Sequence, residues 1–228
     1  GLGKGIYNSI FMSISSYCNA GIDIFGANHG AYSSMSVYQG APFVLGVTSV
    51  LIIIGGLGFV VWHDLASFSK TRKLLLHTKL VLIYSAVLIV GGAVAFAVTE
   101  WNNPGTIGSF STGEKIWNTL YYSINLRTTG FSTFNVSELT GLSKMISVIL
   151  MFIGAAPGST GGGIKVTTFV VLLMTTYCVM RGKDETMVMG RRIARQVVYK
   201  ALTVTVLAIA ACFVSACVLS FTAHTDNI

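Results

Sequence analysis

The sequence predicts an all-α polytopic membrane protein in which helices alternate with re-entrant pore helices and one transmembrane helix is broken. The first observation is composition: 53% of the 228 residues are hydrophobic and 10% are charged, which is too apolar for an ordinary soluble domain. The second is that three runs are long enough to span a bilayer with almost no internal charge: 42–62, 80–99 and 198–222. The third is an internal repeat of a short helix followed by a glycine-centred segment.

A glycine-dense segment at 154–165 interrupts what would otherwise be a fourth spanning helix. The apolar runs beside it, 143–153 and 166–180, are each too short to cross a hydrocarbon core of roughly 30 Å at about 1.5 Å per residue. The break therefore lies at membrane depth, where non-helical backbone is tolerated only if it is buried in protein or lines a water-filled path. This segment predicts a permeation pathway.

The formal charge of +7, from 15 Lys and Arg against 8 Asp and Glu, indicates membrane topology and not nucleic-acid binding. Basic residues concentrate at 63–79 and 181–200, while 100–143 has few of them. Because basic loops stay in the cytoplasm, we expect the first two segments inside and the third outside. The four cysteines and four histidines show no spacing typical of a metal site or catalytic dyad, and the cysteines are interpreted as small buried hydrophobes.

The repeat relates the N-terminus to the segment that begins at Ser111. A capping-box pattern at 111–114 predicts a helix that starts there and runs to Asn125, too short to span. A shift of 110 residues aligns 6–14 with 116–124, and after the helix the shift falls to 109, so that Gly21 aligns with Gly130. One extra residue in the first copy explains the change, although chance similarity of two amphipathic helices is the alternative. Two pore loops do not close a four-fold filter, so we infer an internal piece of a longer polypeptide.

The two loops offer main-chain oxygens to an ion. A short helix that points its C-terminus at the membrane centre aims the negative end of its dipole there, which favours a cation. The extended segment that follows supplies carbonyls that can replace a water shell, and a central glycine keeps the bore free of side chains. Potassium suits such ligands better than calcium or magnesium, which favour carboxylates. The candidate backbone ligands are Asn19, Ala20, Gly21, Thr128, Thr129 and Gly130.

Three charged residues lie close to these elements. Arg127 would repel a cation, so we expect it to turn away from the axis and brace its loop, with Glu138 as a candidate partner. Asp23 either concentrates cations at the outer mouth or serves as a solvated cap or as one side of a surface ion pair. Lys165 is expected just below the broken helix, facing water or a partner carboxylate, because an unpaired lysine at that depth is costly.

The motifs at 19–21, 127–131 and 157–165 resemble the Trk/Ktr/HKT superfamily of potassium transporters, most closely the membrane subunit of the bacterial Ktr system. The resemblance covers essentially the whole chain and implies a potassium-channel-like fold of four helix–pore loop–helix repeats. It assigns 1–72 to the second pore loop and following helix, 73–185 to the complete third repeat, and 186–228 to a basic cytoplasmic loop and the first helix of the fourth repeat. It also implies potassium uptake, a potassium ion held at filter glycines Gly21 and Gly130, and an intramembrane gate loop. The gate residues are Gly158, Ser159, Thr160, Gly161, Gly162 and Gly163.

The same resemblance implies partners and location. Such subunits are multi-pass proteins of the plasma or inner membrane, work as homodimers in the lipid bilayer, and are regulated by a cytoplasmic nucleotide-binding ring. The basic segment 181–200 is a candidate docking surface for that ring, but it serves equally well as a topology signal that meets anionic lipid. Potassium is the implied substrate and sodium an implied activator. No covalently bound cofactor and no nucleic acid are expected.

Other interpretations are weaker. The segment 158–165 resembles a phosphate-binding loop, but the required Gly-Lys-Ser/Thr is absent because Ile164 intervenes and Val166 follows. Ser159 as an intramembrane protease nucleophile lacks a histidine at membrane depth, so an enzyme is not expected. A sodium-conducting relative of the same fold and a non-conducting accessory protein remain alternatives. A conducting potassium filter should lose selectivity or affinity when Gly21 or Gly130 becomes serine.

Overall fold

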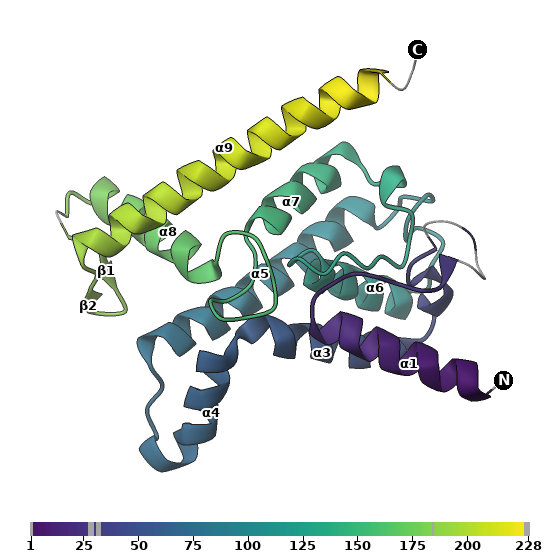
Figure 1. Ribbon diagram of the computed structural model, residues 1–228, viewed down its shortest axis with the longest axis horizontal. Helices are drawn as coiled ribbons and strands as arrows, with labels where there is room; N and C mark the ends of the chain where they lie inside the picture. The colour runs from purple at the N-terminus through teal and green to yellow at the C-terminus, as the bar shows by residue number, and fades with distance from the viewer. Residues whose placement is uncertain (1, 27–29, 31–32, 184, 226–228) are drawn as a thin grey trace. The chain divides into compact units, whose positions relative to one another are not determined.

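The computed structural model describes residues 2–26, 30, 33–183 and 185–225, and almost all of its regular structure is helical (Figure 1). Contacts divide the chain into two compact units, 1–166 and 167–228. The elements, in chain order, are α1 (Leu2–Tyr17), η1 (Ser36–Tyr38), α3 (Pro42–Leu57), α4 (Phe59–Thr71), α5 (Leu76–Glu100), α6 (Thr112–Asn125), η2 (Val136–Glu138), α7 (Gly141–Phe152), α8 (Val166–Met180), β1 (Met187–Val188), β2 (Arg191–Arg192) and α9 (Arg195–Thr225).

Two helices of the described residues are long and apolar enough to cross a membrane by themselves, α5 and the Arg195–Thr222 part of α9. The pair formed by α3 and α4 also passes if it is counted as one span, but it is bent by 94°. The expectation of one continuous helix over 42–62 is therefore wrong. The shorter apolar helices α7 and α8 flank the predicted break, which confirms that the segment between them is not helical.

The bend between α3 and α4 has its cause in another part of the chain. Gly58 takes a left-handed φ of 81°, and a Cβ there would lie 2.5 Å from the carbonyl oxygen of Pro157. The amide of Phe59 donates to the carbonyl of Gly158 at 3.1 Å, and Trp62 Nε1 donates back across the bend to Ile54 O at 3.0 Å. These bonds stabilise the broken helix, because they replace helical partners that a sharp kink removes.

The short helix α6 lies at the centre of the first unit and packs against both α5 and α3 (Figure 1). Its start confirms the predicted capping box: Ser111 Oγ accepts from the Glu114 amide while the Glu114 carboxylate accepts from the Ser111 amide. The approach of α5 is close, because a Cβ on Gly92 would lie 2.4 Å from Ser123 Oγ. That hydroxyl donates to Ile89 O at 2.7 Å and joins the two helices.

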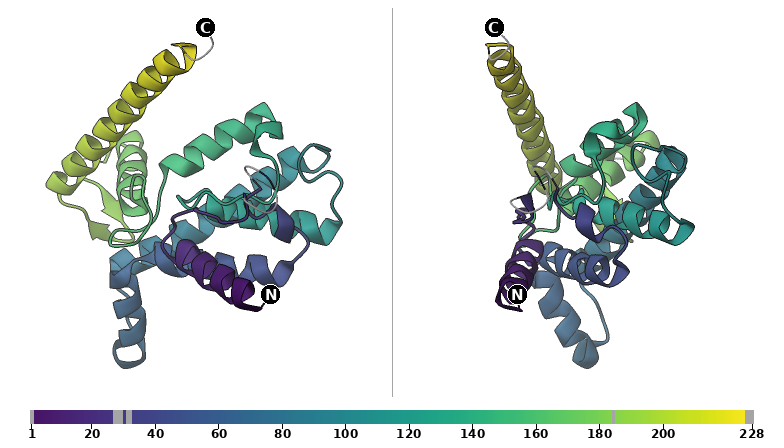
Figure 2. Two further views of the ribbon diagram at one scale, coloured as in Figure 1. Left: turned by 45° about the vertical axis from the view of Figure 1, so that its right-hand side comes forward. Right: turned by 90° about the vertical axis from the view of Figure 1, so that its right-hand side faces the viewer.

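Helix α1 packs along α3 in the same unit (Figure 2). A Cβ on Gly55 of α3 would lie only 2.0 Å from the carbonyl oxygen of Tyr17, the last residue of α1. This glycine therefore lets two backbones meet. A buried cluster then joins α1, α3 and α6 through Met12, Phe25, Met35, Leu45, Ile52, Tyr121, Ile124 and Phe131.

The second unit contains a two-stranded hairpin that the sequence did not predict. Strands β1 and β2 pair antiparallel through a two-residue turn, in which Met189 (φ 47°) and Gly190 (φ 76°) are both left-handed. Beside the hairpin, Arg192 pairs with Glu185 at 2.6 Å. The expectation of uniformly buried cysteines is wrong: among the four, only Cys178 of α8 is buried, while Cys18 and the two on α9 are exposed.

Candidate functional site

The first pore segment follows α1 directly. Asn19 and Gly21 both have left-handed φ angles, 49° and 66°, with Ala20 of ordinary φ between them. The hydroxyl of Ser15 donates to Ile22 O at 2.7 Å and accepts from the Ile22 amide at 3.2 Å, so the segment folds back against the end of its helix. Asparagine is one of the few residues besides glycine that adopt the left-handed region readily, which suits it to this position.

The second pore segment has the same backbone pattern. Thr128 and Gly130 are left-handed at 78° and 101°, with Thr129 between them. The amide of Thr129 donates to Asn125 O at 3.0 Å, as the amide of Ala20 does to Ser15 O at 3.0 Å. The latter bond spans one residue more, so the extra residue of the first copy lies between Ser15 and Ala20, where the alignment of the two repeats requires it.

The two pore segments contact each other. A Cβ on Gly21 would lie 1.8 Å from Thr129 O and 3.3 Å from the Cα of Gly130. The Thr129 hydroxyl also donates to Asn19 Oδ1 at 3.2 Å. The structure thus brings the six predicted backbone ligands together, from elements about 110 residues apart, and Gly21 lies where no side chain could be accommodated.

The glycine-rich loop between α7 and α8 is closed at its base by main-chain bonds. Ile153 and Ile164 form a parallel bridge, with Gly154 N donating to Ile164 O at 2.9 Å. Inside the loop, Lys165 Nζ donates to Gly161 O at 2.6 Å. Lys165 was expected to face water or a partner carboxylate; its partner among the described residues is a loop carbonyl, which satisfies a donor that would be costly to leave unpaired.

The tip of this loop contacts the ends of both pore segments. Thr160 Oγ1 donates to Tyr17 O at 3.1 Å, and the Gly162 amide donates to Thr128 Oγ1 at 3.0 Å. The loop is also fixed to α3, because the Thr160 amide donates to Gly55 O at 3.2 Å. Of the six predicted gate residues, Thr160, Gly161 and Gly162 lie against Tyr17 and Thr128, next to the predicted filter residues, while Gly158 lies against Phe59 and Gly163 against Gly154. One hydroxyl bond joins the loop to the end of α1, and another joins it to the second pore segment.

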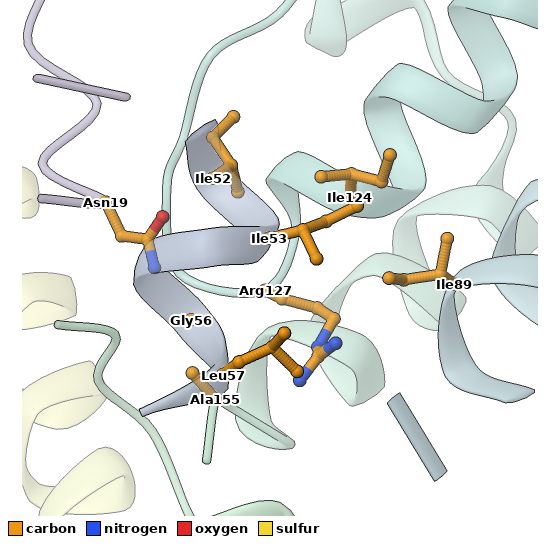
Figure 3. Close-up of a pocket in the computed structure, with 9 residues that line it drawn as sticks. All are labelled: Asn19, Ile52, Ile53, Gly56, Leu57, Ile89, Ile124, Arg127 and Ala155. Atoms are coloured by element: carbon orange, nitrogen blue, oxygen red, sulfur yellow. The ribbon is translucent and has the colours of Figure 1, made fainter. Parts of the chain in front are cut away.

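Arg127 does not pair with Glu138, and that expectation is wrong. Within the described residues Arg127 is in no ion pair, and its side chain is 9% exposed. It points behind the pore segment toward Leu57 and Ala155, on the other side of a small cavity from Asn19 (Figure 3). Glu138 instead lies near Asn103, whose amide nitrogen donates to its main-chain carbonyl at 2.9 Å.

Asp23 serves as a local cap, since its Oδ1 accepts from the Phe25 amide at 3.0 Å. The carboxylate of Glu100, which the sequence analysis did not single out, is 1% exposed and ties the end of α5 to the start of α7. It accepts from the amide and hydroxyl of Thr140 at 3.0 and 2.7 Å and from Thr106 Oγ1 at 2.8 Å. The sequence signal for this role is a glutamate at the end of an apolar run, directly before polar residues.

Metal ligands of the usual side-chain kind do not assemble in the part of the chain that the structure describes, where no group of three or more His, Cys, Asp or Glu could hold an ion. His29, one of the four histidines, lies outside the described residues. The oxygens that the two pore segments offer are those of the main chain and of the Asn19, Thr128 and Thr129 side chains.

Comparison with known proteins identifies the family. A family model described as TrkH, cation transport protein, matches residues 3–227. The potassium/sodium uptake protein NtpJ of Enterococcus hirae is 37% identical over 223 residues, 97% of this chain and 48% of that protein. Ktr system potassium uptake protein B of Bacillus subtilis is 33% identical over 222 residues, again 97% and 48%.

The fold matches as well. The crystal structure of the potassium transporter TrkH from Vibrio parahaemolyticus superposes with a TM-score of 0.70 at 19% identity, over 95% of this chain and 45% of that one. The chain spans about half the length of the curated relatives it matches. It is a multi-pass membrane protein. The chain belongs to the TrkH family of cation transport proteins.

Proposed function

We propose that this chain is part of the ion-conducting subunit of a potassium uptake protein in the cell membrane. The observation that carries the proposal is the matched backbone of the two pore segments, left-handed at Asn19 and Gly21 and again at Thr128 and Gly130. When residues of left-handed and ordinary φ alternate, successive carbonyl groups point to the same side of the backbone. In a β-strand they point to alternate sides. Two segments that do this while in contact supply part of an oxygen-lined filter.

The electrostatics of the segments support a monovalent cation. Each segment follows the C-terminus of a helix, α1 or α6, whose dipole is equivalent to roughly half a negative charge at that end. Carbonyl oxygens alone suit potassium, while calcium and magnesium favour carboxylates. Sodium is the second candidate, because one relative is named a potassium/sodium uptake protein. It is also a candidate activator.

The glycine-rich loop is proposed as the gate. Single hydroxyl bonds join it to the end of α1, just before the first pore segment, and to the second pore segment: Thr160 Oγ1 donates to Tyr17 O, and the Gly162 amide donates to Thr128 Oγ1. Each such bond contributes about 1 kcal/mol, and the glycines make other backbone states accessible. A loop fixed by a few weak bonds can leave the pore segments at a modest cost.

The whole assembly is a further part of the proposal. We assign 1–72 to the second pore loop and its helix, 73–185 to the complete third repeat, and 186–228 to the start of the fourth, with the remaining repeats outside this chain. A homodimer and a cytoplasmic nucleotide-binding ring are the proposed partners. The exposed basic hairpin at Arg191 and Arg192 is one surface that such a ring could bind.

The filter is tested by Gly130→Ser in the full-length protein, expressed in cells that lack potassium uptake. Gly130 is the better of the two glycines to change, because its Cβ would meet only the Cα of Gly21, at 4.0 Å. We expect the potassium-over-sodium uptake ratio to fall about tenfold or more. Gly182→Ser, where the added atom has open space and the φ of 67° is left-handed like the 101° of Gly130, is the matched control. An unchanged ratio in Gly130→Ser, with normal expression, would contradict the filter.

The gate is tested separately by Thr160→Val, which removes the hydroxyl and keeps the shape. We expect a higher maximal uptake rate with an unchanged ion preference, since about 1 kcal/mol of loop contact corresponds to a change of roughly fivefold. Thr160→Ser retains the donor and should behave like the unmodified protein. Equal rates in the valine and serine variants would refute the role of this bond.

A further inference from the structure

The guanidinium of Arg127 is a buried charge without a counter-charge among the described residues. Its side chain is 9% exposed, its Nε has no hydrogen-bond partner, and no carboxylate of the described chain lies within ion-pair distance. Ionised groups at membrane depth almost always pair with an opposite charge or a carbonyl, because lipid and apolar protein do not solvate them. The arrangement around Arg127 is therefore incomplete.

A second unpartnered donor lies across the same cavity. Asn19 is 7% exposed, its Nδ2 has no partner, and its Oδ1 already accepts from Thr129. The two side chains line a cavity of about 20 Å³, with the side chains of α3, α5 and α6 as the walls (Figure 3). The other lining residues are Ile52, Ile53, Gly56, Leu57, Ile89, Ile124 and Ala155. Such a volume holds about one water-sized group.

We infer that Arg127 and Asn19 form a binding site for one singly charged anionic acceptor. Two sources supply this chemistry: a chloride ion, or a carboxylate oxygen from the part of the protein that this chain does not span. Both side-chain atoms without partners are donors, so an acceptor completes them and a cation does not. The apolar walls supply no competing acceptor side chain.

A negative charge is favoured over a neutral water for a physical reason. A water can accept from the guanidinium and the amide, but it leaves the positive charge uncompensated in an apolar surrounding. Charged acceptors form hydrogen bonds about twice as strong as neutral ones with such donors. The size of the cavity excludes larger anions such as phosphate or sulfate.

The site has a consequence for transport, and this consequence rests on the proposed function. Arg127 precedes Gly130 by three residues, so its charge lies on the order of 10 Å from an ion in the filter. An uncompensated unit charge at that distance, with an effective dielectric constant of about 20, weakens cation binding by about an order of magnitude. An anion at Arg127 removes most of that repulsion.

The site is tested by thermal unfolding of the purified full-length protein, with potassium chloride replaced by potassium gluconate at constant ionic strength. If chloride is the acceptor, the midpoint falls by roughly 3–5 °C in gluconate, as expected for loss of a ligand present at about 100 times its Kd. Arg127→Gln removes this response, while Arg191→Gln, which changes an exposed arginine, retains it. Anomalous scattering from bromide beside Arg127 supports the same source without any variant.

The carboxylate source gives a different result. The midpoint is then independent of chloride, Arg127→Gln lowers it, and neutralising the carboxylate found beside Arg127 in the full-length structure restores it. The inference is overturned if the unfolding midpoint changes neither with the anion nor in Arg127→Gln and only water is found at the Arg127 guanidinium. Uptake assays report on the filter separately: an anion-dependent midpoint with unchanged cation affinity keeps the site and rejects its role in transport.

Discussion

Two glycines of α3, Gly55 and Gly46, provide a sharp test of the packing around the pore segments. A Cβ on Gly55 would lie 2.0 Å from Tyr17 O and 3.0 Å from Thr160 Oγ1, whereas one on Gly46 would meet nothing within 4 Å. Ordinary contact begins at 3.4 Å, so Gly55→Ala forces the Tyr17 carbonyl to move away by well over 1 Å. Gly46→Ala forces no movement.

The change in the free energy of unfolding follows from the contacts that are lost when the Tyr17 carbonyl moves. Overpacking against a main-chain atom costs about 1–3 kcal/mol. The bonds from Thr160 to Tyr17 O and to Gly55 O contribute about 1 kcal/mol each, while alanine in a helix returns about 1 kcal/mol relative to glycine. Gly55→Ala should therefore destabilise the protein by about 2–4 kcal/mol, while Gly46→Ala is neutral or stabilises it by up to about 1 kcal/mol.

The assay is thermal unfolding of both full-length variants in the same detergent, followed by potassium uptake in cells at matched expression. Gly55→Ala should lower the unfolding midpoint and alter uptake, since Tyr17 ends the helix that leads into the first pore segment. Gly46→Ala should match the unmodified protein in both. Equal midpoints for the two variants, or a larger loss in Gly46→Ala, would refute the close approach of α1 to α3.

Two further predictions concern α5 and α6. Gly92→Ala should destabilise the protein by about 1–3 kcal/mol, because its Cβ would lie 2.4 Å from Ser123 Oγ. Gly91→Ala should not, because its Cβ would meet nothing within 4 Å. The unfolding midpoints of the two variants test this, and an equal fall in both would contradict the packing of α5 on α6. The amide and hydroxyl of Ser111 lower the pKa of Glu114 from its ordinary value of 4.5, so the cap contributes stability above that pH and loses it as the pH falls through the lowered pKa. The unfolding midpoint measured against pH should show this loss of stability, and Glu114→Gln should remove the pH dependence. If the variant and the unmodified protein lose stability identically in acid, the cap is not the source of the loss.

The sequence predicted those elements whose causes are local. The start of α6 was readable because Ser111 and Glu114 form a cap within four residues of each other. The break between α7 and α8 was readable because a run of glycines cannot sustain a helix. The pairing of Gly21 with Gly130 was expected from the repeat, and the structure adds the matched φ signs and the contact between them.

The features that could not be predicted depend on distant parts of the chain. The apolar pattern continues through Gly58, and the bend there follows from the approach of Gly158, about 100 residues later. Glu138 is the nearest acidic residue to Arg127 downstream in sequence, yet it lies by Asn103 instead. The hairpin at 187–192 was too short and too polar to show a strand pattern.

The hydrogen bond between Phe59 and Gly158 ties α4 to the glycine-rich loop. The axis of α4 turns by 94° from that of α3 at Gly58, and the first amide of α4 donates to the loop carbonyl at 3.1 Å. The N-terminal end of α4 and the glycine-rich loop therefore cannot separate without losing this bond.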